Sequence, residues 1–354
     1  MSGDSYASWS AIQAALKATA QREISEGRAS GHDLSQRLTQ ARFDRFLSRV
    51  FADGGERWML KGGTAMLARI PDTRATRDID LGTSQDLDEA IHDLTERARV
   101  DLGDHVTFTL AGLKNTGLGD NQPGVSLKKV IFVATDSQTG KKIGDVSVDV
   151  AVTPAPVGTP ELLEPASRLQ LPKPLQSSPW RLYPLSDHIA DKVRGVMSRY
   201  GESPSTRVKD LVDLVTIART QTVNARELQL ALASKILQSN VPADVSEFRV
   251  PDTWRSASGT REFKRLAGMS PARGISKIQE AEDLVAELVT PALAPEPIPD
   301  EVRWTPTVGW EATPDSCPAS TGDPIAGVGA VWVREHIRGG WPVREHTRGP
   351  RGRS

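Results

Sequence analysis

The clearest hydrophobic pattern in the chain is a strict alternation over residues 144–152. The apolar positions are Val146, Val148, Val150 and Val152, and the positions between them are Asp145, Ser147, Asp149 and Ala151. Successive side chains of a strand point to opposite faces, so this pattern predicts a strand with one apolar and one polar face. Residues 125–134 predict its hairpin partner, because a turn sequence lies between the two runs.

Apolar residues at helical spacing predict N-terminal helices over residues 8–28 and 33–51. The short run Trp58-Met59-Leu60 predicts a buried strand, and residues 86–99 predict a helix with acidic residues in its first turn. Residues 106–110 alternate as a strand does. Helices and strands in this order favour an α+β fold, in which helices pack on a mixed sheet.

The second half of the chain predicts a different organisation. Residues 153–180 are rich in proline and lack periodicity, so we interpret them as a crossover. Two helices follow, one capped by Ser186 and one starting at Ser203-Pro204. We therefore predict a first domain over residues 1–165 and a helical C-terminal lobe over 166–290, with Trp254 and Phe263 in its core. Residues 291–354 are rich in Pro, Gly and Arg and predict a disordered tail.

Most of the candidate functional residues lie between residues 57 and 81. Gly62-Gly63 ends the strand at residues 58–60, and Thr64 begins a run of helix formers, which collects backbone N–H groups where an anion can bind. Asp78 and Asp80 then lie on one face of the next predicted strand. Two adjacent carboxylates repel each other, and a divalent cation between them relieves the repulsion. Asp149 is a third carboxylate, placed in mid-strand between valines, where a cation is its best partner.

Each of these features alone has an ordinary explanation. Gly-Gly is commonly a plain turn, and Asp-x-Asp is commonly a solvated strand edge. The anion cradle and the paired carboxylates together, each preceded by a strand, are typical of phosphoryl or nucleotidyl transfer.

Four segments of the sequence resemble a known family. KGGTAML, TRDIDL, YPLSDHIADKV and TRVKDLVDLV are similar, in this order, to motifs of the AbiEii/MenT toxins. These belong to the nucleotidyltransferase superfamily with a DNA polymerase β-like palm, so the resemblance implies that residues 1–165 form such a palm with N-terminal helices. It also implies that Lys192 binds the phosphates of the nucleotide, and that either Asp210 or Asp213 completes the active site.

The resulting hypothesis is transfer of a nucleoside monophosphate from an NTP to a hydroxyl group. Asp78, Asp80 and Asp149 would hold Mg²⁺, with Mn²⁺ as a substitute. The nucleotide would be bound by Lys61, Gly62, Gly63, Thr64 and Lys192. A structural alternative is open for Lys192, which could instead form an ion pair with Asp210 or Asp213 that joins two helices.

The acceptor and the partners follow only from the resemblance. It implies RNA, with the 3′ end of tRNA as the acceptor, a block of translation, and a toxin with a cognate antitoxin. Nucleotidylation of a small molecule or protein is an alternative, and so is a non-catalytic module that binds nucleotide or RNA. We also consider that arginines could line an RNA cleft; these are Arg37, Arg42, Arg45, Arg49, Arg194, Arg199 and Arg207.

Composition narrows these hypotheses only slightly. A formal charge of −1 gives no global signal for nucleic-acid binding, so an RNA site would depend on local clustering. A single cysteine excludes an intramolecular disulfide framework. The sequence shows no signal peptide and no apolar run of the ~20 residues that a membrane span needs. We therefore expect a cytoplasmic protein without a membrane partner.

Overall fold

The computed structural model of the chain describes residues 5–28, 32–115, 127–200, 203–237, 241 and 245–312. The helices are α1 (Trp9–Ser25), α2 (Leu34–Val50), α3 (Gly62–Arg69), α4 (Leu87–Ala98), α5 (Leu185–Met197), α6 (Val208–Thr220), α7 (Ala225–Leu237), α8 (Ala257–Ala267) and α9 (Ile278–Val289), with 3₁₀ turns η1 (Asp252–Arg255) and η2 (Thr290–Leu293). The strands are β1 (Met59–Lys61), β2 (Ile79–Thr83), β3 (Val106–Asn115), β4 (Leu127–Asp136), β5 (Lys142–Val152), β6 (Glu161–Leu163), β7 (Trp180–Leu182), β8 (Arg199–Tyr200), β9 (Ser203–Pro204), β10 (Val223–Asn224), β11 (Val302–Thr305) and β12 (Gly309–Ala312).

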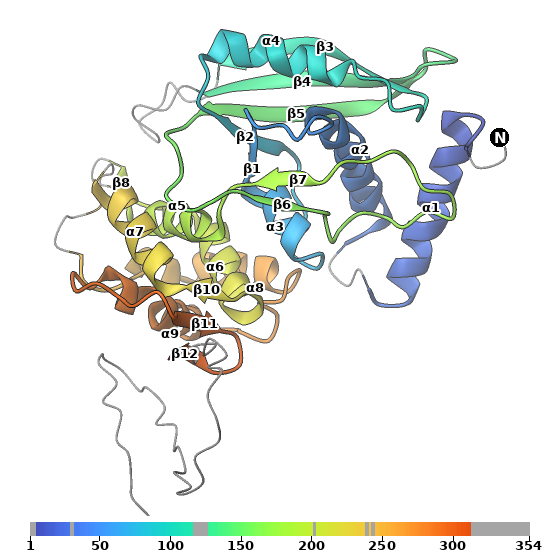
Figure 1. Cartoon of the computed structure of the whole chain (residues 1–354). Helices are drawn as coiled ribbons and strands as arrows, with labels where there is room; N and C mark the ends of the chain where they lie inside the picture. The colour runs from blue at the N-terminus through green and yellow to red at the C-terminus, as the bar shows by residue number, and fades with distance from the viewer. Residues whose placement is uncertain are drawn as a thin grey trace, which may run out of the picture.

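The main sheet has the strand order β3-β4-β5-β2-β1-β7-β6. The pairs β2–β5 and β1–β7 are parallel, and the other neighbours are antiparallel. Strands β4 and β5 form the predicted hairpin. The mixed sheet lies at one end of the molecule and the later helices gather at the other (Figure 1), so the predicted α+β class is confirmed.

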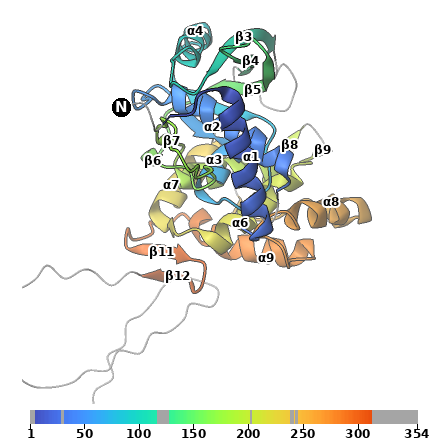
Figure 2. The same cartoon turned by 90° about the vertical axis from the view of Figure 1, so that its right-hand side faces the viewer.

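One face of this sheet is apolar and covered by helices. Val146, Val148 and Val150 of β5 are fully buried in a cluster with side chains of α1, α2 and α4. Helix α2 starts at a capping box, in which the Asp33 side chain accepts from the Gln36 N–H and the Gln36 side chain accepts from the Asp33 N–H. Helix α1 packs on α2 (Figure 2). The opposite, polar face of the sheet is thereby left for the site.

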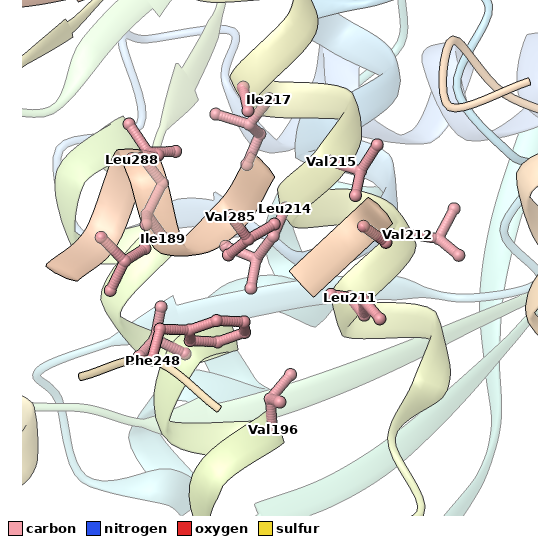
Figure 3. Packing of buried hydrophobic residues seen from close by; sticks show 14 of the residues in the cluster. Ile189, Val196, Leu211, Val212, Leu214, Val215, Ile217, Phe248, Val285 and Leu288 are labelled. Atoms are coloured by element: carbon pink, nitrogen blue, oxygen red, sulfur yellow. The ribbon is translucent and has the colours of Figure 1, made fainter. Parts of the chain in front are cut away.

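The helical lobe has its own apolar core. Leu211 and Leu214 of α6, Val285 and Leu288 of α9, and Phe248 belong to one buried cluster (Figure 3). Trp254 and Phe263 are also buried there, which confirms that they are core residues. Within the described residues, no helix is long and apolar enough to cross a membrane.

The structure corrects several predicted boundaries. The proline-rich crossover contributes β6 and β7 to the sheet, so the first domain extends beyond residue 165. Ser186 lies inside α5, whose N-cap residue is Pro184. Ser203 and Pro204 form β9 rather than a helix start, and α6 begins at Val208. The sequence pattern did not predict β6, β7 and β9, because strands of two or three residues are too short to show the alternation of apolar and polar positions.

The tail prediction is wrong for residues 291–312. Strand β11 pairs with β10 and β12, and Trp304 is 3% exposed in the lobe core. Its indole Nε1 donates to the carbonyl oxygen of Ala218 at 2.8 Å. One buried tryptophan on a short hairpin therefore anchors a segment whose composition suggested disorder. The rest of the predicted tail, residues 313–354, lies outside the described residues.

Three of the arginines proposed for an RNA cleft are structural. Arg49 binds Asp104 in bidentate fashion at 2.9 and 2.6 Å. Arg45 donates to the carbonyl oxygen of Gln176, and Arg37 to that of Ser167. All three arginines are buried. They tie α2 to the crossover and to the start of β3, so the prediction that they line a cleft is wrong.

We predict that Trp304→Ala lowers the free energy of unfolding by about 3–5 kcal/mol, because it leaves a cavity in the lobe core and an unpaired carbonyl on Ala218. Chemical denaturation measures this. Trp310→Ala is the matched control, since Trp310 lies on the same hairpin but is only partly buried; its loss should be clearly smaller. Equal effects of the two substitutions would contradict the assignment of Trp304 as the anchor.

Candidate active site

A row of charged residues crosses the polar face of the sheet. The strand register aligns Lys61 of β1 with Asp80 of β2, Asp80 with Asp149 of β5, and Asp149 with Lys129 of β4. Directly paired residues on neighbouring strands share a face and lie about 5 Å apart. The sheet itself therefore brings together two of the predicted carboxylates, with a lysine on each side.

Asp80 lies against the start of α3. A Cβ atom added to Gly62 would lie 1.8 Å from Asp80 Oδ2, and Gly62 has a φ of +61°. Glycine is required here both for the left-handed backbone and for the close approach of the carboxylate. The Asp80 carboxylate is thus held at a helix N-terminus, where the helix dipole favours negative charge.

Asp78 is positioned by hydroxyl groups at the entry to β2. Thr64 Oγ1 donates to the backbone carbonyl of Asp78 at 3.0 Å, and Thr76 Oγ1 donates to Asp78 Oδ1 at 3.2 Å. Gly63 lies close to Thr76, since an added Cβ would be 2.9 Å from Thr76 Cβ. Thr64 is buried and supports the site in this way; its predicted contact with a triphosphate stays a prediction.

The carboxylate trio, defined as Asp78, Asp80 and Asp149, carries electrostatic strain. Burial, followed by the charges of Asp78 and Asp149, raises the pKa of Asp80 from 3.8 to about 6. The pKa of Asp149 is also raised, first by burial, although Lys129 opposes the shift. Within the described residues, no hydrogen bond or ion pair reaches the Asp80 carboxylate. Asp80 is therefore the member of the trio whose charge is not neutralised by a direct partner among these residues.

Lys129 is a site residue that the sequence analysis missed. Its Nζ lies 3.1 Å from Asp149 Oδ1 and 3.6 Å from Asp78 Oδ2. The predicted hairpin contained the information needed to find it. If β4 and β5 align so that Lys129 faces Asp149, the lysine lies on the polar face of the sheet. Periodicity alone does not fix register, so a lysine on one strand could not be assigned to a carboxylate on another.

A second charged cluster joins α5 to α6. Lys192 Nζ lies 2.6 Å from Asp213 Oδ2 and 3.3 Å from Asp210 Oδ1. Arg74 binds Asp213 through two hydrogen bonds of 2.9 and 2.8 Å, and Arg207 pairs with Asp210 at 2.6 Å. Burial alone would raise the pKa of Asp213, but Lys192 and Arg74 lower it well below its ordinary value. The structural ion pair considered for Lys192 is thus present, and both aspartates take part in it.

Lys61 also has a partner in the lobe. Its Nζ lies 3.1 Å from Asp191 Oδ2 of α5 and 4.0 Å from the centroid of the Tyr183 ring. Burial would raise the pKa of Asp191, but Lys61 and then Lys235 lower it to about 2. Lys61 therefore helps to hold the lobe on the sheet, and its predicted contact with a nucleotide stays a prediction.

The donors of the trio suit a hard divalent cation such as Mg²⁺, which prefers carboxylate oxygens. The raised pKa of Asp80 agrees with this fit, because burial and then the charges of Asp78 and Asp149 disfavour its ionised form, and a bound cation would offset both. In the part of the chain that is described, no three His, Cys, Asp or Glu side chains already converge on one metal position. Asp78, Asp80 and Asp149 could hold the ion only after a modest rearrangement around Lys129.

The comparisons with known proteins define the class as nucleotidyltransferase. The model of the family "Nucleotidyl transferase AbiEii toxin, Type IV TA system" matches residues 45–285. The chain belongs to this family and is a nucleotidyltransferase toxin of a type IV toxin–antitoxin system. Membership implies a cognate antitoxin as partner. A search of curated proteins gave no match.

A search of solved structures also gave matches. The nucleotidyltransferase toxin MenT4 from Mycobacterium tuberculosis is 17% identical, with a TM-score of 0.44, and the match covers 76% of this chain and 93% of that one. JHP933 from Helicobacter pylori is 14% identical, with a TM-score of 0.38, and the match covers 73% of this chain and 93% of that one. The family assignment rests on the match to the family model.

We predict that Asp80→Asn stabilises the metal-free protein at neutral pH. Because folding raises the pKa of Asp80 from 3.8 to about 6, the folded state binds a proton more tightly than the unfolded state does. Wild-type stability therefore falls as the pH rises through this window, whereas asparagine has no such dependence. The melting temperature of the variant should exceed that of wild type at pH 7.5 and approach it near pH 4. A less stable variant at pH 7.5 would contradict the assigned strain. Asp145→Asn, which changes an exposed carboxylate on the neighbouring strand β5, is the control.

We also predict that Lys192→Met lowers the free energy of unfolding by about 1–3 kcal/mol, because it leaves buried carboxylates with fewer partners. The loss should be smaller than the roughly 3–5 kcal/mol typical of an isolated buried pair, since Arg74 and Arg207 still neutralise Asp213 and Asp210. Urea denaturation measures it. Lys209→Met removes an exposed lysine of the same region and should cost much less. Unchanged stability of the Lys192 variant would show that the ion-pair cluster does not support the fold.

Proposed function

We propose that the protein transfers a nucleoside monophosphate from an NTP to RNA, with the 3′ end of tRNA as acceptor, and thereby blocks translation. The observation that carries this proposal is the direct pairing of Asp80 with Asp149 across β2 and β5, beside Asp78 and the N-terminus of α3. Carboxylates concentrated next to a helix N-terminus suit a metal-bound triphosphate. Family membership supports nucleotidyl transfer as the reaction.

In the proposed reaction an acceptor hydroxyl oxygen attacks the α-phosphorus. The bond from that phosphorus to the β-phosphate oxygen breaks, pyrophosphate leaves, and the hydroxyl proton is released. Mg²⁺ held by Asp78, Asp80 and Asp149 would neutralise phosphate charge and lower the pKa of the hydroxyl. The backbone at Gly62 and Gly63 would hold the phosphates, with Lys61 and Thr64 beside it.

Cationic side chains act on the trio or lie near it along the chain and the sheet. The charges of Lys192 and Lys209 both lower the pKa of Asp80, so both lysines lie within electrostatic range of it. Lys209 is exposed, as are Arg77 and Lys114. These side chains could bind the triphosphate and the RNA backbone, so Lys192 can act on phosphate while it pairs with Asp210 and Asp213. This local charge supports a polyanionic acceptor despite the neutral chain.

We predict that wild type transfers label from α-³²P NTPs, and not from γ-³²P NTPs, to purified tRNA in the presence of Mg²⁺. Asp80→Asn and Asp149→Asn should reduce transfer at least about 100-fold, since each removes a charge aimed at the reacting phosphates. Asp145→Asn is the matched control, because Asp145 lies on the same face of β5 as Asp149 but at the exposed start of the strand, where it pairs with Lys142. Its transfer rate should match that of wild type.

The same assay tests the acceptor. Periodate oxidation of the tRNA destroys the 3′-terminal diol and should abolish labelling if the 3′ end is the acceptor. Label on oxidised tRNA, or label found only on protein or small molecules in a cell extract, would contradict the proposed acceptor. Equal transfer by the Asp80 and Asp145 variants would contradict the proposed site.

A further inference from the structure

Lys129 occupies the space between two members of the trio. Its ammonium lies 3.1 Å from an Asp149 oxygen and 3.6 Å from an Asp78 oxygen, on the polar face of β4. The side chain is 27% exposed, so it is not locked in place by packing. The register explains its position, because Lys129 is the direct neighbour of Asp149 across the hairpin.

A cation at this point performs the electrostatic task of a metal ion. It bridges carboxylates of two strands, β5 and the entry to β2, and reduces the repulsion between them. The ammonium and a divalent ion need the same oxygen atoms, so they cannot occupy this place together. Lys192 and Lys209 also act on Asp80 from the lobe, but among the described residues the ion-pair partner of both Asp78 and Asp149 is Lys129.

We propose that Lys129 is a built-in counter-cation of the carboxylate trio, which a divalent metal ion must displace in order to bind. This inference rests on the proposed function, because it takes the trio as the metal site. Competition from the Lys129 ammonium makes metal binding by the nucleotide-free protein weak. A metal-bound triphosphate brings negative charge that can receive the displaced ammonium, so nucleotide and metal bind more strongly together than apart.

The test is a titration with Mn²⁺ alone, without nucleotide, in which electron paramagnetic resonance reports the free ion. Lys129→Met should bind Mn²⁺ about tenfold more tightly than wild type, which corresponds to about 1.4 kcal/mol. Lys129→Arg keeps the charge and should bind as wild type does. Each protein is first checked by circular dichroism, and Lys129→Gln replaces the methionine variant if the latter is not folded.

Lys128→Met is the matched control for loss of one positive charge. Lys128 is the adjacent residue of the same strand, and it pairs with the exposed Asp88 of α4 at 2.7 Å rather than with the trio. Its Mn²⁺ affinity should stay within twofold of that of wild type. A similar gain in both variants would mean that overall charge is responsible, and would overturn the specific role of Lys129.

An Mn²⁺ affinity of Lys129→Met that equals or falls below that of wild type would also overturn the inference. This result is distinguishable from failure of the proposed function. If the Asp80 variant loses nucleotide transfer while the Lys129 variant shows no gain in Mn²⁺ affinity, the trio is catalytic and Lys129 is not its competitor. If wild type transfers no nucleotide, the proposed function falls, whatever the Mn²⁺ titration shows.

Discussion

Repulsion between Asp80 and Asp149 is the constraint on which the rest of the site depends. Parallel pairing of β2 with β5 places these two carboxylates side by side, and Asp78 adds a third negative charge. Like charges directly opposed on neighbouring strands are destabilising. The arrangement persists because Lys129 flanks it on one side, the dipole of α3 lies beside Asp80, and the valines of β5 fix the strand from the other face.

Ion pairs between charged side chains also join the lobe to the sheet. Arg74, which lies between α3 and β2, binds Asp213 of α6, and Lys61 of β1 binds Asp191 of α5. These contacts bring Lys192 close to the carboxylates while both of its aspartate partners stay neutralised. We therefore expect substitutions in this region to change stability and activity together, and only measurements of both can separate the ion pairing of Lys192 from its proposed role in binding phosphate.

Much of the site could be predicted from the sequence because strand alternation is a local property. Asp78, Asp80 and Asp149 could be assigned to one polar face from the identity of their neighbours alone. Lys129 could not, because its role depends on how two strands align. The role of Arg49 was misjudged for a similar reason: helical spacing gives a residue's direction around the helix, but Asp104, its partner, is distant in sequence. The burial of Trp304 was not predicted, because its segment was assigned to a disordered tail from average composition. One large apolar side chain changes that average very little.

The position of Trp304 also affects the order in which the lobe is assembled during synthesis of the chain. Its indole closes on the last turn of α6, the helix that supplies Asp210 and Asp213. A ribosome adds this tryptophan long after it has made the carboxylates and the glycine turn. A nascent chain thus carries the carboxylate trio before Trp304 can secure α6, the helix that places Asp210 and Asp213 beside Lys192. The lobe therefore closes around the candidate site only after the hairpin of β11 and β12 has been synthesised.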